Sequence, residues 1–323
     1  MKMKTIGIGI GILVLLGIIC TAAGVSLLLD AGHTPDSPLP GNHSDLAGSV
    51  KSGSTANFTY TVSAALPSVP ETVVLYRVVK PEVTTELISS IAEKMGLNGT
   101  VRESHDQMLL SDDPYSLEVH MKSGRIVLID TPRWMNPNDR DQPENLPQDD
   151  EAVRIATGYL EKTGLLPPDA TPSAIDHQEI ARYNEKGERI GTAYEEVQVS
   201  YSRTIDGLPV VGSKLTVEIG GDGDILSVYK LWRDYAPEKE VAITTPKEAL
   251  DELKTAGVAT GLSADITGIK LGYYEAPATR EPTYLVPVYI FTGRVLDGTG
   301  EETSFVRYVP ASPDFREEIP AVK

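Results

Sequence analysis

Cysteine is almost absent from this sequence, since Cys20 is the only one in 323 residues. A single cysteine excludes a disulfide within the chain and a zinc site built from several thiolates. Signatures of catalysis are also lacking: there is no HExxH zinc motif, no Gly-x-Ser-x-Gly elbow and no phosphate-binding loop. The histidines are scattered along the chain as His33, His43, His105, His120 and His177. We therefore expect a protein that is not an enzyme, with no catalytic residues, no cofactor and no metal ion.

Basic residues are scarce relative to acidic ones. The chain has 29 Lys and Arg residues against 46 Asp and Glu residues, which gives a formal net charge of -17 at pH 7. Such an acidic surface repels nucleic acid and anionic lipid headgroups. The composition is otherwise that of a globular protein, with 41% hydrophobic and 23% charged residues. Nucleic acid is therefore excluded as an expected partner.

Charged residues are missing from residues 5–29, an apolar run that follows Lys2 and Lys4. A helix that crosses a bilayer needs about 20 apolar residues. The alternative is a cleavable signal peptide ending near Thr21-Ala22-Ala23, but the apolar run continues to Leu29 and favours an uncleaved signal-anchor. Because the basic end should stay in the cytoplasm, we expect a single-pass protein of the cell membrane, with its C-terminal domain outside the cytoplasm.

Large apolar residues are rare between residues 30 and 70, where Pro, Gly, Ser, Thr and Asn dominate. This composition predicts a flexible stalk with at most a short strand near Phe58 to Val62. Three asparagines fit the N-glycosylation acceptor pattern. They are Asn42, Asn57 and Asn98. The predicted export makes these three residues the predicted glycosylation sites.

The remaining chain alternates between amphipathic helices and strands. Helices are predicted from Pro81 to Gly96, from Asp150 to Gly164, and from Thr245-Pro246, where a cap and a first-turn proline coincide, to Gly257. Strands follow each helix, so we expect an α+β fold of tandem units, each an antiparallel sheet with a helix packed on one face. The predicted domains are a transmembrane helix at 1–29, a stalk at 30–70, a first α+β unit at 71–131, a linker at 132–149, a second unit at 150–240, a third α+β unit at 241–311 and a C-terminal tail at 312–323.

The stretch from Tyr201 to Trp232 has the clearest pattern. Alternation of apolar and polar residues predicts three strands, and the two connections between them are glycine-rich. Gly207-Leu-Pro suits a turn, whereas Gly212 suits a bulge or a close approach of two backbones. Asp222-Gly223-Asp224 is typical of a hairpin turn. It also suggests calcium, although the further oxygen ligands of a calcium loop are missing.

Two other groups of residues have alternative interpretations. His177 and Glu179 alternate on a predicted strand and so share a face, which suits either two metal ligands or two solvated polar side chains; the missing third ligand favours the latter. Several aromatic residues suit either a binding groove or packing against a sheet, and strand spacing favours packing. These aromatic residues are Trp232, Tyr273, Tyr274, Tyr284 and Tyr289.

Several short segments carry a resemblance to a known family. They are Arg203–Gly212 (RTIDGLPVVG), the Asp222-Gly223 hairpin, the helix after Thr245-Pro246, and the C-terminal segments Leu271–Tyr274, Tyr284–Tyr289 and Tyr308–Ala311. Together they resemble the PepSY superfamily, which occurs in metallopeptidase propeptides and in membrane-tethered regulators. Within it the chain is most similar to the YycH/YycI type, regulators of a cell-wall sensor histidine kinase. The resemblance covers about residues 71–311, and its motifs are structural rather than catalytic.

The resemblance implies a non-catalytic protein-binding module. Its implied partner is a sensor kinase or an exported peptidase, with contact to the membrane through the N-terminal helix. Pro287, inside an apolar run, predicts an edge strand or a bulge, and an exposed edge there would accept a strand from a partner. Two alternatives remain open, a peptidase inhibitor or propeptide-like chaperone and a structural cell-surface protein.

Overall fold

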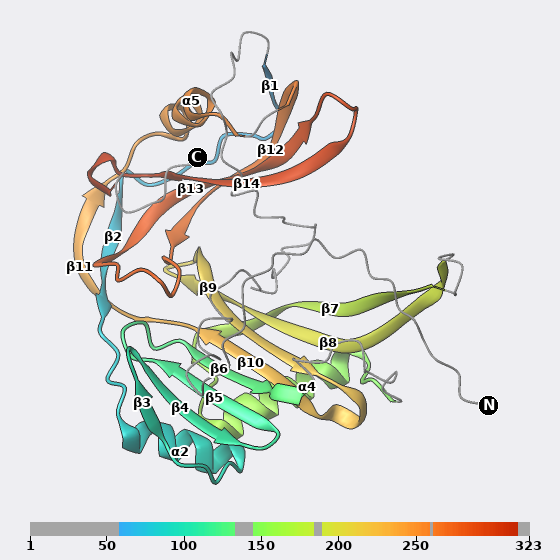
Figure 1. Cartoon of the computed structure of the whole chain (residues 1–323). Helices are drawn as coiled ribbons and strands as arrows, with labels where there is room; N and C mark the ends of the chain where they lie inside the picture. The colour runs from blue at the N-terminus through green and yellow to red at the C-terminus, as the bar shows by residue number, and fades with distance from the viewer. Residues whose placement is uncertain (1–57, 133–144, 184–188, 259–260, 316–323) are drawn as a thin grey trace.

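The structure is a computed structural model, which describes residues 58–132, 145–183, 189–258 and 261–315. These residues form two lobes joined by strands (Figure 1). The first lobe holds α2 (Thr85–Met95), α4 (Asp149–Thr163), β3 (Arg102–Ser104), β4 (Gln107–Asp112), β5 (Tyr115–His120), β6 (Ile126–Asp130), β7 (Ala170–Tyr183), β8 (Arg189–Ile205), β9 (Leu208–Ile219) and β10 (Ile225–Leu231). The second holds β1 (Thr59–Val62), β2 (Thr72–Val79), β11 (Asp234–Ala242), α5 (Pro246–Ala256), β12 (Ser263–Tyr274), β13 (Tyr284–Leu296) and β14 (Glu302–Pro310).

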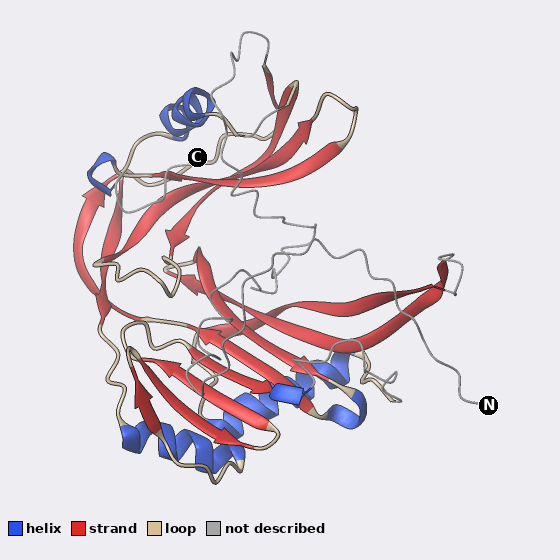
Figure 2. Ribbon diagram, viewed as in Figure 1, coloured by secondary structure: helices blue, strands red, loops and turns tan. Residues whose placement is uncertain are grey.

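The first lobe is an antiparallel sheet with two helices on one face (Figure 2). Its strands follow the order β7-β8-β9-β10-β6-β5-β4-β3. Alternate residues of β8 and β9 turn toward the helices, so that Val199 and Val217 are fully buried. There they join Ile88 of α2 and Leu160 of α4 in one core. The two helices therefore cover a single shared sheet.

The three predicted helices are present, with small differences at their ends. Thr84 caps α2 by accepting a hydrogen bond from the Leu87 N–H group at 3.2 Å, so the helix begins four residues after Pro81. Leu87, in the first turn of α2, is 43% exposed. In the second lobe, Thr245 and Glu248 form the reciprocal capping pair that the sequence predicted for α5.

The second lobe is built on the long antiparallel pairing of β12, β13 and β14. β1 adds to the outer side of β12 in parallel, while β2 lies between β13 and β11. Leu250 and Leu253 of α5 pack into the core of this lobe with Phe291 and Val288. Sequence reasoning missed β11, because Pro237 and several charged residues interrupt its apolar pattern.

The lobes meet where β12 runs parallel to β9. Tyr273 lies opposite Val210 and Tyr274 opposite Val211, and the Glu275 N–H group donates to the Val211 carbonyl at 2.8 Å. Tyr273, Val210 and Leu285 form a small buried cluster at this point. This short contact makes one mixed sheet out of the strands of both lobes.

The prediction of tandem units with separate antiparallel sheets is therefore wrong. β6 of the first predicted unit pairs with β10 of the second, with Ile129 opposite Ser227. β2, which was expected to open the first unit, belongs to the other lobe. Hydrophobic alternation fixes which side of a strand is buried, but it says nothing about which strand lies beside it. How the chain divides into independently folding domains stays a prediction.

The predicted membrane topology also requires correction. Within the part of the chain that the structure describes, no helix has both the length and the apolar character needed to span a membrane. The predicted transmembrane helix at 1–29 lies outside the described residues. The single-pass topology, the signal-anchor and the localisation inferred from them are therefore not upheld.

Pro287 does not lie on an exposed edge, as the sequence had suggested. β13 has β12 on one side and, on the other, β2 as far as Leu285 and β14 from Val288 onward. Pro287 occupies the change from one neighbour to the next, where its carbonyl accepts a hydrogen bond from the Ala311 N–H group. A proline is tolerated here because its missing N–H falls in the gap between two partner strands.

Candidate functional site

The turn between β8 and β9 brings the segment Arg203–Gly212 to the junction of the lobes. Asp206 and Gly207 both have positive φ angles, 53° and 76°, as a two-residue hairpin turn with right-handed strand twist requires. The predicted turn at Gly207 is therefore confirmed. Five residues further on, Gly212 has φ +92°, and a Cβ atom placed there would lie 2.1 Å from the carbonyl oxygen of Glu275. The close backbone approach predicted for Gly212 is also confirmed.

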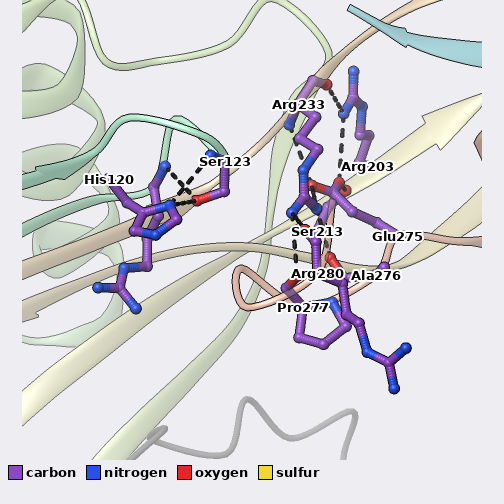
Figure 3. A network of polar contacts seen from close by, with 10 residues as sticks. His120, Ser123, Arg203, Ser213, Arg233, Glu275, Ala276, Pro277 and Arg280 are labelled. Atoms are coloured by element: carbon purple, nitrogen blue, oxygen red, sulfur yellow. Dashed lines mark hydrogen bonds and ion pairs between the residues drawn. The ribbon is translucent and has the colours of Figure 1, made fainter. Parts of the chain in front are cut away.

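A buried group of charges lies beside this approach. Arg203 follows the core residues of β8, Arg233 follows β10, and Glu275 follows β12; we call these three residues the ionic cluster (Figure 3). The Glu275 side chain is fully buried, and the arginine side chains are only 6% and 2% exposed. The Arg233 Nη1 atom lies 3.2 Å from Glu275 Oε1, and the Arg203 Nη1 atom lies 3.9 Å from Oε2.

Two further groups donate hydrogen bonds to the Glu275 carboxylate. The Ser213 hydroxyl group donates to one of its oxygens and the Arg233 backbone N–H group to the other. Burial raises the pKa of Glu275, whereas the hydrogen bond from Ser213 and the charge of Arg233 lower it and so limit the rise. Burial also raises the pKa of the neighbouring Tyr235 hydroxyl, and the charge of Glu275 adds to the effect.

Arg203 is held from several directions. Its Nε atom donates to Asp169 at 2.6 Å, and its Nη1 atom donates to the Arg233 carbonyl at 2.7 Å. Its guanidinium lies 5.2 Å from the centre of the Trp232 ring and 4.9 Å from that of Tyr235, both within cation–π range. Trp232 in turn donates from its indole N–H group to Asp169. Arg203 is therefore fixed in one position.

Arg233 connects the ionic cluster to the surface. Its guanidinium donates to three backbone carbonyls, those of Ala276, Pro277 and Arg280. These belong to residues 276–283, the connection between β12 and β13, which we call the pinned loop. Figure 3 shows the three carbonyls turned toward Arg233. One buried side chain thus fixes both the lobe junction and an exposed loop.

The metal and calcium interpretations, which the sequence already disfavoured, find no matching geometry in the described residues. Among the side chains that the structure describes, those of residues 58–132, 145–178, 196–258 and 261–315, no group of three or more His, Cys, Asp or Glu is arranged to hold a metal ion. Gly221–Gly223 forms a single 3-10 turn, in which Asp222 accepts a hydrogen bond from Asn145 at 3.1 Å. His177 lies 2.9 Å from Asp149, while the side chain of Glu179 is outside the described part.

The aromatic residues considered for a groove pack inside the protein instead. Tyr273 and Tyr289 are fully buried, and each donates its hydroxyl hydrogen to a backbone carbonyl, that of Val74 and that of Thr244 respectively. Tyr274 and Tyr284 are half-buried against the core of the second lobe, and Trp232 belongs to the core of the first. The packing interpretation is confirmed.

The remaining predicted residues lie apart from the ionic cluster. His120 is half-buried and shares a hydrogen bond of 2.8 Å with Ser123, whereas His105 is exposed. Asn98 is exposed at the end of α2, so its glycosylation stays a prediction; Asn42 and Asn57 lie outside the described residues.

Sequence reasoning included Arg203 in its motif but missed Arg233, Glu275 and Asp169. A charged residue directly after a strongly apolar strand was the available signal at Arg233 and Glu275.

Comparison with known proteins points to one short segment. Residues 196–230 match the family model of the Fungalysin/Thermolysin Propeptide Motif. This segment runs from the last part of β8 through β9 to the end of β10, and it contains Arg203, Gly212 and Ser213. The expected likeness to metallopeptidase propeptides is therefore confirmed over these residues, whereas nothing found is specific to the YycH/YycI type.

Two further comparisons are less informative. No match is found among curated proteins. A crystal structure of an uncharacterized protein from Eubacterium rectale ATCC 33656 is similar over 79% of this chain and 88% of that chain, at 11% sequence identity and a TM-score of 0.45.

Proposed function

We propose that this protein binds a zinc peptidase of the thermolysin type and inhibits it, as a propeptide does, without being a catalyst itself. The observation that carries the proposal is the match of residues 196–230 to the propeptide motif. These residues form the centre of the first lobe, and their strand β9 pairs with β12 of the second. The matched segment is therefore a structural centre of the molecule rather than a peripheral insertion.

The proposal is supported by the way the site is built. The ionic cluster is buried and saturated with internal contacts, so it serves to hold the lobes and the pinned loop in place. An inhibitor needs such a rigid frame, because a surface that is already ordered loses less conformational entropy when it binds. A sensor kinase as partner has no comparable observation behind it.

Purified full-length protein should inhibit thermolysin when a quenched fluorescent peptide is the substrate. We expect an inhibition constant below about 1 µM, the range of a specific interface of standard size. A serine peptidase assayed under the same conditions serves as the control and should be unaffected. Unchanged thermolysin activity in the presence of about 100 µM of the folded protein would falsify the proposal.

A further inference from the structure

The pinned loop has an unusual arrangement of its main chain. Three of its carbonyls accept hydrogen bonds from one guanidinium, that of Arg233. The donor–acceptor distance is 3.1 Å for Pro277 and for Arg280, and the Ala276 carbonyl accepts the third hydrogen bond. The Arg280 N–H group donates back to the Pro277 carbonyl at 3.0 Å, which closes a turn. The loop is thus tied to the interior along its main chain, while much of its outer surface remains accessible.

Side chains alternate between the interior and the solvent along this loop. Ala276 and Ala278 are buried, whereas Pro277, Thr279 and Arg280 are exposed. The Arg280 side chain points away from Arg233 and the ionic cluster (Figure 3). Small residues therefore fill the inner side, and the outer side presents a basic group on a chain whose net charge is -17.

A second contact steadies the far end of the loop. Lys122, in the turn between β5 and β6 of the first lobe, lies 3.3 Å from Glu281 and 3.1 Å from Asp106. These exposed ion pairs add little energy, but they place the loop against the other lobe. The pinned loop is therefore held by Arg233 through its main chain and by Lys122 through the side chain of Glu281.

This arrangement has a chemical consequence for contact with a peptidase. A zinc peptidase cleaves a peptide bond after its metal ion polarises the carbonyl of that bond. The carbonyls of Ala276, Pro277 and Arg280 are turned inward to Arg233 and cannot reach such a metal ion. The bonds that follow these three residues are therefore protected unless the loop opens locally.

We propose that residues 277–281 of the pinned loop are the segment that enters the substrate cleft of the zinc peptidase, with Arg280 as the central contact. This inference rests on the proposed function. Arg280 is the exposed arginine of this segment, and arginine is enriched among the residues that contribute most to binding at protein interfaces. A pre-ordered loop whose Pro277 and Arg280 carbonyls are held by Arg233 resists cleavage after these residues, which is the behaviour of an inhibitor rather than a substrate.

Reversal of charge at Arg280 tests the contact. In the full-length protein, Arg280→Glu should raise the inhibition constant for thermolysin at least about tenfold, as expected for an arginine at the centre of an interface. Arg294→Glu is the matched control, because Arg294 is an exposed arginine on the distal part of β13 and pairs with Glu302. Thermal unfolding of both variants should match that of the unchanged protein.

The outcomes separate the inference from the proposed function. If Arg280→Glu inhibits as well as the unchanged protein, the loop is not the contact, although the protein remains an inhibitor. An equal loss for Arg280→Glu and Arg294→Glu would also overturn the inference, since general charge would then explain both. If the unchanged protein does not inhibit, the proposed function fails, and the inference fails with it.

Release of the carbonyls provides a second test. Arg233→Lys keeps the positive charge beside Glu275, but the lysine ammonium group lacks the planar set of N–H donors with which the guanidinium binds three carbonyls. During incubation with thermolysin, cleavage within residues 276–283 should become at least about tenfold faster than in the unchanged protein, as measured by mass spectrometry. Arg125→Lys is the control, because Arg125 is also buried but pairs with Glu118 in the first lobe. The inference is overturned if the loop remains as resistant in Arg233→Lys as in Arg125→Lys.

Discussion

Replacement of Glu275 by alanine should lower the free energy of unfolding by about 3–5 kcal/mol, because it leaves two buried arginines without their shared carboxylate. Arg233 and Arg203 are 2% and 6% exposed, so solvent cannot take over the lost interaction. Ser213 and the Arg233 backbone N–H group lose their acceptor at the same time. Urea denaturation followed by tryptophan fluorescence measures the change, since Trp232 stacks on Arg203.

Two controls give this result its meaning. Glu302→Ala removes an exposed carboxylate that pairs with Arg294 and should change the free energy of unfolding by less than about 0.5 kcal/mol. The double variant Glu275→Leu with Arg233→Met should be less destabilised than the sum of its single variants, because it removes both buried partners together. A loss below about 1 kcal/mol for Glu275→Ala would show that the cluster does not hold the lobes together.

Replacement of Gly212 by alanine should destabilise the protein by about 2–5 kcal/mol through steric conflict and backbone strain together. Its φ of +92° is unfavourable for any residue with a Cβ atom. The added Cβ would also lie 2.1 Å from the Glu275 carbonyl oxygen, so the backbone itself has to move. That movement would separate β9 from β12, where the Glu275 N–H group donates to Val211.

Gly207→Ala measures the backbone strain without the steric conflict, so the difference between the two variants gives the steric part. Gly207 also has a positive φ, +76°, but a Cβ atom added there would have no neighbouring atom within 4 Å. Strain alone should cost about 1–2 kcal/mol there. Thermal or urea unfolding of the two variants should therefore differ by at least about 1 kcal/mol. Equal losses would contradict the idea that the close approach to Glu275 matters.

Local structure followed largely from the sequence. The helix at Asp149–Thr163 differs by one residue at its start from the prediction, because Gly164 and the charged first turn mark its ends clearly. The hairpins of β8, β9 and β10 were also predicted, since glycines with positive φ mark their turns. The turn between β3 and β4 was harder to predict, because there His105, not a glycine, takes a positive φ of 54°.

The ionic cluster could be predicted only in part. Arg203 and Gly212 lie in one short motif, and the sequence suggested that Gly212 allows a close approach. The partner in that approach, Glu275, is more than sixty positions away along the chain, and Arg233 comes from a third segment. Charged residues at strand ends are usually solvated, so nothing local distinguished these three from the other charges of an acidic protein.

The sequence by itself determined the elements: helix ends, turns, buried faces and the glycine that admits a neighbouring backbone. These depend on interactions between residues a few positions apart, which propensity and periodicity record. The tertiary structure alone decided that two predicted units share one sheet, that β2 belongs to the far lobe, and that Arg233 ties a loop to a buried carboxylate. Those features depend on which strands become neighbours, and the free energy that selects them comes from burial and from pairing of charges across the whole chain.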